Sequence, residues 1–261
     1  MTVSTRELFG LPIAALTMHE AVSLAERAIE RRQPMMFGVV NAAKIVNMQR
    51  DDELRRAVLA SDVILADGAS VVIAARLLGR PLPERVAGID LMIALLERAS
   101  ERGHAVYCLG ATAEVLAGVE RVVALLYPGA RLVGSHHGYY GTADEADVAA
   151  AIAAARPDIL FVAMTSPRKE RFLARWRGAL NVPVCHGVGG SFDVLAGKVR
   201  RAPPVWRRLG MEWLYRVAQE PGRLWKRYLI TNSAFLGMLL VELLRAAPPR
   251  IAGVLRRRRT A

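Results

Sequence analysis

Short apolar runs alternate with longer segments of helical spacing between residues 35 and 189. The runs are rich in Val, Ile and Phe, which is typical of buried strands. They lie at 35–40, 62–66, 105–110, 159–164 and 182–189. The segments between them, such as 88–103 and 111–126, repeat Ala, Leu, Arg and Glu at helical spacing. We therefore predict an α/β fold in which βαβ units form a parallel sheet covered by helices on both faces.

The residues that follow the predicted strands are the first candidates for chemistry, because such sheets bind ligands beyond the carboxyl ends of their strands. Asn41 follows the first run, and Asp67 follows the second. The fifth run leads into the glycine-rich turn GVGGSFD (187–193), which is suited to bringing backbone amides close to a diphosphate. This turn matches neither G-x-G-x-x-G nor the P-loop pattern. The candidate nucleotide-binding residues are Gly110, Gly187, Gly189, Gly190, Phe192 and Asp193.

Asp67 has two interpretations. As an ionised carboxylate at the mouth of the sheet, it could deprotonate an attacking hydroxyl group. It could equally cap a helix that begins near Ala69. Asp90 presents the same choice between capping the helix at 91–102 and binding a donor substrate, and Arg85 could pair with a phosphate or with Asp90.

We expect neither a metal ion nor a cofactor. The chain contains no D-x-D pair of the kind that often holds a divalent cation. His136 and His137 are adjacent, so on a strand they would point to opposite faces. The charge of a leaving group must then be met by Arg, Lys or backbone amides.

The two cysteines and the N-terminus indicate a cytoplasmic chain. Cys108 and Cys185 lie in separate apolar runs and are typical of core thiols in a reducing compartment. The first residues lack the basic start and the long apolar stretch of a signal peptide.

The net charge of +12 comes from the last quarter of the chain. Residues 1–197, here called the body, carry 21 Lys and Arg against 21 Asp and Glu. Residues 198–261, here called the appendage, carry 15 Lys and Arg against 3 Asp and Glu. We place the domain boundary between these two segments, because an excess of basic charge indicates an anionic partner for the appendage.

The appendage also has apolar character. Helices are predicted at 211–221 and 222–245, with Trp, Tyr and Leu among the basic residues. Its run Leu229–Leu244 falls short of the roughly 20 apolar residues that a spanning helix needs. We predict an interfacial helix on an anionic membrane surface, helped by RRRR (256–259). The alternative is that the run packs on the body or in an oligomer interface.

Seven motifs resemble, in order, those of the WecG/TagA/CpsF glycosyltransferase family. They are NAAKIV (41–46), ILADGASVV (64–72), RVAGIDL (85–91), SPRKE (166–170), GVGGSFDVLAG (187–197), RRAPPVW (200–206) and GMEWLYRVAQEPGRLWKRYL (210–229). The resemblance extends from about residue 8 to residue 230.

The resemblance implies a Rossmann-like α/β body with a helical appendage that completes the site at the membrane. It implies an inverting, metal-independent enzyme at the cytoplasmic face of the inner membrane, in cell-surface or exopolysaccharide synthesis. A hexose-type sugar (N-acetylmannosamine, a uronic acid or glucose) would move from a UDP-sugar to a polyprenyl-diphosphate-linked saccharide. Asp67 matches the family's general base, and Arg216 and Arg223 match appendage arginines that meet the diphosphate. The candidate substrate-binding residues are Asn41, Arg85, Asp90, Lys169, Arg216, Arg223 and Lys226.

Three positions depart from the family pattern. Val39 stands where many members have threonine, and Lys169 stands where the family motif has glutamine. Lys226 replaces a third appendage arginine, which keeps the charge and loses the bidentate fork. We hypothesise that Lys169 lies near the donor sugar and favours one that bears a carboxylate; the alternative is that Lys169 pairs only with Glu170 or solvent.

Two other classes of function are alternatives to a glycosyltransferase. A non-catalytic, nucleotide-sugar-binding scaffold of a polysaccharide assembly complex would bind UDP without transferring a sugar, and Val39 and Lys169 make this conceivable. Nucleic-acid binding by the appendage is disfavoured, because phosphate contacts need charge and not an apolar face. An apolar face on the appendage is compatible with self-association as well as with lipid.

Overall fold

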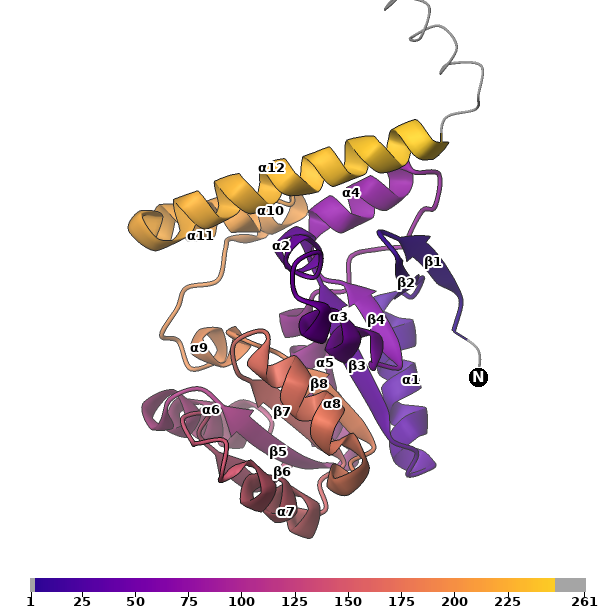
Figure 1. Ribbon diagram of the computed structural model, residues 1–261. Helices are drawn as coiled ribbons and strands as arrows, with labels where there is room; N and C mark the ends of the chain where they lie inside the picture. The colour runs from indigo at the N-terminus through magenta and orange to yellow at the C-terminus, as the bar shows by residue number, and fades with distance from the viewer. Residues whose placement is uncertain (1–2, 247–261) are drawn as a thin grey trace, which may run out of the picture.

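The computed structural model describes residues 3–246 and contains one eight-stranded sheet in the order β1-β2-β4-β3-β8-β7-β5-β6 (Figure 1). Only the β1–β2 pair is antiparallel. The strands are β1 (Thr5–Leu8), β2 (Leu11–Ala14), β3 (Met35–Val40), β4 (Val63–Ala66), β5 (Ala105–Gly110), β6 (Arg131–His136), β7 (Ile159–Ala163) and β8 (Val184–Gly187). The predicted α/β fold with a largely parallel sheet is confirmed.

Helices cover both faces of the sheet. One face packs against α1 (Met18–Glu30), α5 (Gly88–Arg102) and α6 (Ala113–Leu126). The other packs against α3 (Asp52–Leu59), α7 (Glu145–Ala155) and α8 (Arg168–Leu180). The shorter helices α2 (Ala42–Asn47), α4 (Ala69–Leu77) and α9 (Ser191–Leu195) begin just beyond the carboxyl ends of β3, β4 and β8. Functional side chains at that edge are therefore held by strand ends and by helix starts.

All five predicted strands are present, and the three that the apolar pattern missed lie at or near the sheet edges. None of the β6 residues is fully buried, so that strand lacks a continuous apolar run. The β1–β2 hairpin turns through Phe9 and Gly10, which both have positive φ angles. Its strands are four residues long, too short to show a clear period.

The C-terminal helices pack across the end of the body where the parallel strands finish (Figure 1). They are α10 (Pro204–Arg208), α11 (Glu212–Gln219) and α12 (Pro221–Ala246). The inward side of α12 buries Phe235 and Leu239 in the cluster that also holds residues of α2 and α4. The Phe235 ring lies 5.0 Å from that of Phe9, whose N–H donates to Glu242 Oε1 at 3.1 Å.

The outward side of α12 is also apolar. Its most exposed large side chains, each 58–63% exposed, are Leu229, Ile230, Leu236, Leu240 and Leu244. The segment Leu224–Arg245 is long and apolar enough to cross a membrane by length and composition alone. The helix is therefore apolar on the side that faces the body and on the side that faces away. The RRRR run at 256–259 lies outside the described residues.

Substitutions of Phe235 and of its neighbour Leu236 test whether α12 is docked on the body in the absence of lipid. Phe235→Ala should lower the free energy of unfolding by about 3–5 kcal/mol, because it leaves a cavity against Phe9. The control Leu236→Ala removes an exposed side chain from the same helix and should change it by less than about 0.5 kcal/mol. Chemical denaturation in detergent-free buffer measures both values. Equal effects of the two variants would contradict the docked position of α12.

Candidate active site

Asn41 and Asp67 leave the sheet side by side. The β3 and β4 strands are parallel and pair Val40 with Ala66, so the next residue of each strand emerges at the same level. A Cβ atom added to Gly68 would lie 3.1 Å from the Asn41 Cβ atom, so the glycine allows this close approach. Asn41 also caps α2, because its Oδ1 accepts the N–H of Lys44 at 3.0 Å.

Asp67 does not cap the helix that follows it. The N-cap of α4 is Gly68, which makes no side-chain cap bond, so that interpretation of Asp67 is wrong. The Asp67 Oδ1 atom instead accepts the N–H of Gly88, the first residue of α5, at 2.9 Å. A carboxylate is favoured at this position by the partial positive charge of the helix N-terminus. Among the described residues, Oδ2 of Asp67 has no hydrogen-bond partner, so one oxygen remains for chemistry.

Gly88 also connects Asp67 to the core of the sheet. The fully buried His186, in β8, places its Nε2 atom 2.9 Å from the carbonyl oxygen of Gly88. The imidazole lies edge-on to the rings of Phe37 and Phe161. Burial lowers the pKa of His186, so the neutral ring acts as a structural spacer.

Arg85 and Asp90 form part of an ion-pair network that joins the body to the appendage. Arg85 donates to Glu212 of α11 at 2.9 Å and lies 3.7 Å from Asp90. Arg201 donates to the other oxygen of Asp90 at 2.6 Å and lies 3.9 Å from Glu212. Asp90 is in the first turn of α5, whose N-cap is Ala87, so Asp90 is not the cap. The predicted Arg85–Asp90 pair exists, and two appendage residues share it.

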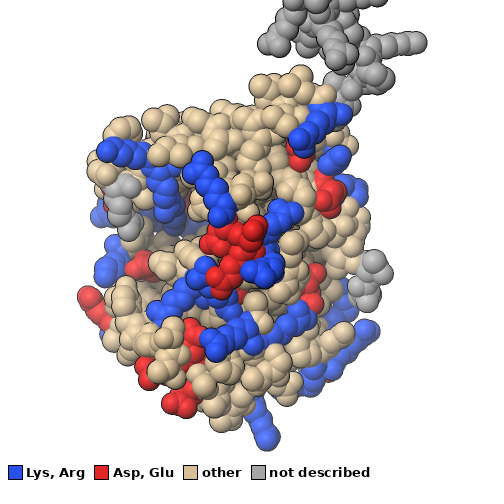
Figure 2. Space-filling model, in the orientation of Figure 1, with Lys and Arg blue, Asp and Glu red and all other residues tan. Residues whose placement is uncertain are grey.

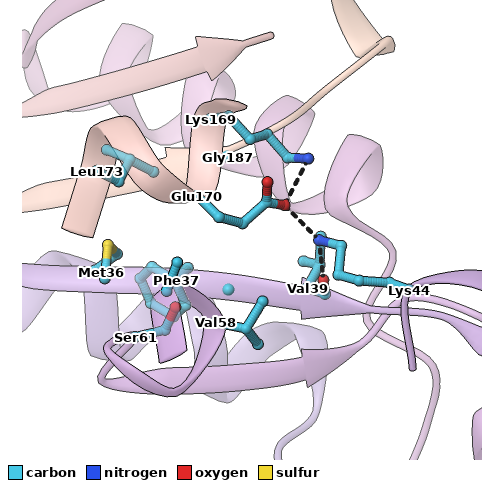
Figure 3. A pocket seen from close by; sticks show the side chains of 12 residues that line it. Met36, Phe37, Val39, Lys44, Val58, Ser61, Lys169, Glu170, Leu173 and Gly187 are labelled. Atoms are coloured by element: carbon cyan, nitrogen blue, oxygen red, sulfur yellow. Dashed lines mark hydrogen bonds and ion pairs between the residues drawn. The ribbon is translucent and has the colours of Figure 1, made fainter. Parts of the chain in front are cut away.

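A second charged cluster is buried beneath the ends of β3 and β8 (Figure 3). Glu170 Oε1 accepts from Lys169 Nζ at 2.7 Å and from Lys44 Nζ at 2.8 Å. Lys44 also donates to the Val39 carbonyl oxygen at 2.6 Å. All three charged side chains are less than 10% exposed. The alternative that Lys169 pairs with Glu170 is thus confirmed as a contact.

The pKa values of this cluster follow from burial and from its two cations. Burial, followed by the charge of Lys44, lowers the pKa of Lys169 to about 8. Burial alone would raise the pKa of Glu170, but the two lysines lower it to about 2. Glu170 is therefore ionised at neutral pH.

The glycine-rich turn after β8 is largely bonded within the protein. The amides of Val188 and Gly189 donate to the Val162 carbonyl at 2.9 and 3.3 Å, and that of Ser191 donates to the Val188 carbonyl at 3.2 Å. A diphosphate cradle built from these amides would have to break those bonds. Gly189 has a φ of +56°, which favours glycine.

Three other candidates for nucleotide binding have different surroundings. The Phe192 side chain is 1% exposed and packs in the core, so it is not available to a ligand. The partly buried Asp193 carboxylate lies beside Gly190, with Oδ2 3.9 Å from the Cβ position of that glycine. Gly110 has a φ of +126°, and a Cβ atom there would lie 2.4 Å from the Ala163 carbonyl oxygen. Gly110 is thus required by the packing of β5 against β7.

Among the appendage cations whose side chains the structure describes, Arg216 and Lys226 do not contact Asp67. Arg216 of α11 is exposed, and among the described residues it has no ion pair with the body. Lys226 of α12 is exposed and lies over the ring of Trp225 at 5.6 Å. The side chain of Arg223 lies outside what the structure describes.

The expected orientation of His136 and His137 is wrong, whereas the expected burial of the two cysteines is confirmed. His136 and His137 do not point apart: β6 ends at His136, and their ring centroids are 4.8 Å from each other. Within residues 3–246, no group of three or more His, Cys, Asp or Glu side chains is arranged to hold a metal ion. Cys108 and Cys185 are free and buried, and burial raises the pKa of each thiol to about 12.

The sequence gave no indication of a role for Lys44, Arg201 or Glu212, and it suggested Glu170 only as a partner of Lys169. All four residues lie in the quoted motifs, and a charged residue on the buried side of a helix is a usable signal, because such residues are seldom buried unless paired. The pairing of Lys44 with Glu170 could not be found, since the two residues are 126 residues apart in the chain.

Comparisons with known proteins show the family of the chain. The profile of the family "Glycosyl transferase WecG/TagA/CpsF family" matches residues 6–248. An N-acetylglucosaminyldiphosphoundecaprenol N-acetyl-beta-D-mannosaminyltransferase of Bacillus spizizenii (strain ATCC 23059 / NRRL B-14472 / W23) is 39% identical over 193 residues, which are 74% of each chain. A protein of the same name from Bacillus subtilis (strain 168) is 32% identical over 241 residues, 92% of this chain and 93% of the relative. The chain therefore belongs to the WecG/TagA/CpsF family and is a glycosyltransferase.

Proposed function

We propose that the protein transfers a hexose-type sugar from a UDP-sugar to a polyprenyl-diphosphate-linked saccharide, with inversion and without a metal ion. The observation that carries this proposal is the Asp67 carboxylate, which is fixed through one oxygen by the α5 N-terminus and keeps the other oxygen at the mouth of the sheet. The names of the two Bacillus relatives support the acceptor, since both act on N-acetylglucosaminyldiphosphoundecaprenol.

The proposed chemistry is a direct displacement. Asp67 removes the proton from an acceptor hydroxyl, whose oxygen forms a bond to the anomeric carbon of the donor. The bond between that carbon and the phosphate oxygen breaks, and UDP leaves with the electron pair. Attack opposite to the leaving group inverts the anomeric centre.

The negative charge of the leaving diphosphate needs donors. The candidates remain the turn at 187–190 with Arg216, Arg223 and Lys226, and also Arg85. Since Arg85 is paired with Glu212, and three turn amides are bonded within the protein, the exposed Arg216 and Lys226 are the more accessible donors. The ion pairs of Arg85 and Arg201 hold α11 against the start of α5, next to Asp67.

We further propose that α12 lies in the cytoplasmic surface of the inner membrane as a peripheral, interfacial helix. Its inward face is occupied by the body, whereas its outward face exposes large apolar side chains. Figure 2 shows a largely uncharged surface along α12, with Lys and Arg gathered below it. A helix that crossed the bilayer would lose the contacts of Phe235 and Glu242 with the body. An in-plane position keeps both.

Asp67→Asn tests the base. Turnover should fall by about 10²–10⁴-fold, because the amide cannot take a proton. The assay is transfer from UDP-sugars to a synthetic polyprenyl-diphosphate-GlcNAc acceptor with EDTA present, where the wild type should stay active. The control Glu101→Gln changes an exposed carboxylate near the other end of α5 and should have little effect.

Near-normal turnover of Asp67→Asn would remove the base assignment. Loss of wild-type activity in EDTA would contradict metal independence. A wild type that binds UDP and transfers no sugar would be the scaffold instead of the enzyme.

The outward face of α12 is tested by the double variant Leu236→Ser/Leu240→Ser. Binding to vesicles of anionic phospholipid, measured by co-sedimentation, should weaken about tenfold or more, because each leucine loses roughly 1 kcal/mol or more of apolar burial. The control is Leu125→Ser/Leu126→Ser, which removes two exposed leucines from α6 and should leave vesicle binding unchanged. Unchanged vesicle binding with an altered oligomeric state in the first variant would instead assign this face to a second copy of the chain.

A further inference from the structure

The buried cluster of Lys44, Lys169 and Glu170 has more positive than negative charge. Two ammonium groups share one carboxylate oxygen, and each of the three side chains is less than 10% exposed. An unbalanced charge in such surroundings is costly unless a further partner compensates it. The other anion that acts on Lys169 is Asp67, which the proposed mechanism assigns to the acceptor hydroxyl.

Lys169 has more unused hydrogen-bond donors than Lys44. Each ammonium has three donors. Lys44 uses its donors on Glu170 and on the Val39 carbonyl, whereas among the described residues Lys169 has Glu170 as its only hydrogen-bond partner. The second oxygen of Glu170, Oε2, is buried without a hydrogen-bond partner. The Lys169 ammonium therefore keeps unused donors beside a carboxylate whose second oxygen is buried (Figure 3).

The strand order places this cluster where the donor sugar should lie. The sheet runs β4-β3-β8, with Asp67 after β4 and the glycine-rich turn after β8. Lys44 donates a hydrogen bond to the Val39 carbonyl oxygen at the end of β3. At the end of β8, a Cβ atom added to Gly187 would lie 3.3 Å from the Lys169 Cδ atom. The cluster thus lies between the base and the turn. A donor whose anomeric carbon faces Asp67 and whose diphosphate faces the turn has its sugar ring above Lys169.

We propose that Lys169 selects a donor whose sugar carries a carboxylate, with the ammonium group pairing with that carboxylate. This inference rests on the proposed function and goes beyond it by naming the class of sugar and the residue that selects it. It sets this chain apart from the two Bacillus relatives, whose names specify a neutral N-acetylmannosaminyl group.

The test is calorimetric binding of two matched donor pairs and of UDP to the full-length protein. The pairs are UDP-glucose with UDP-glucuronic acid, and UDP-N-acetylmannosamine with its uronic acid, which differ only at C6 of the sugar. In at least one pair the wild type should bind the acidic donor about 30-fold or more tightly than the neutral one. Lys169→Gln should bring that ratio close to one and leave the affinity for UDP unchanged, which also shows that the variant is folded.

Three results would overturn the inference. Equal affinity for the acidic and the neutral donor in both pairs, measured on the wild type, needs no variant and would remove the selectivity. A loss of UDP affinity in a folded Lys169→Gln protein would assign Lys169 to the diphosphate. Absence of binding by UDP and by all four UDP-sugars would overturn the proposed function itself, and this inference with it.

A pH series gives a second readout. The titratable groups that act on Lys169 are Lys44, Glu170 and Asp67, and the pKa of Lys169 is lowered to about 8. Lys169 is therefore charged below that pH and loses its proton above it. Affinity for the acidic donor should fall as pH rises from 8 to 10, by at most about tenfold per pH unit. Affinity for the neutral partner should stay constant over the same range, and parallel changes in both donors would contradict the role of Lys169.

Discussion

The hydrogen bond from the N–H of Gly88 to Asp67 is the contact on which the site depends. It joins the end of β4 to the first residue of α5, and the His186 contact with the Gly88 carbonyl joins the same residue to β8. The carboxylate is thus held from the core side by elements that are themselves buried. As the proposed base, Asp67 would not need to be reoriented when the acceptor arrives, which is what catalysis by proton transfer requires.

The appendage packs across the same end of the sheet as the site. The α12 helix is apolar on both sides, and only the side with Phe235 and Leu239 is covered by the body. Because docking and the proposed membrane contact use opposite sides of one helix, the two do not compete. The ion pairs of Arg201 and Glu212 with the body connect the remaining appendage to the start of α5. An acceptor that arrives in the plane of the membrane would therefore reach Asp67 without detaching the appendage.

The sequence predicts the buried parallel strands well, because each is a continuous apolar run between helical segments. It predicts β1, β2 and β6 poorly, because strands that are short or partly exposed carry no such run. Asn41 and Asp67 are found for a topological reason: both follow buried strands, and the β3–β4 register brings them together. The side chain of Phe192, which follows the glycine-rich turn, packs into the core, as is usual for a large apolar residue. Pairings between distant residues, such as Lys44 with Glu170, are set by the packing of α8 on the sheet and have no local signal.

In the proposed mechanism, the charge of Lys169 connects the selection of the donor sugar with the state of the base, Asp67. Lys169 lies within the influence of Asp67, and this carboxylate raises the pKa of Lys169 against the opposing effects of burial and Lys44. With a neutral donor bound, Lys169 would have only Glu170 and Asp67 to compensate its positive charge. Part of the negative charge of Asp67 would then stabilise Lys169 instead of acting on the acceptor hydroxyl. In the proposed mechanism, a sugar carboxylate paired with Lys169 would take over that compensation and leave Asp67 to the acceptor hydroxyl. The residue that selects the donor would then also determine how completely the base is available for the reaction, because both act through the same small buried volume at the ends of β3, β4 and β8.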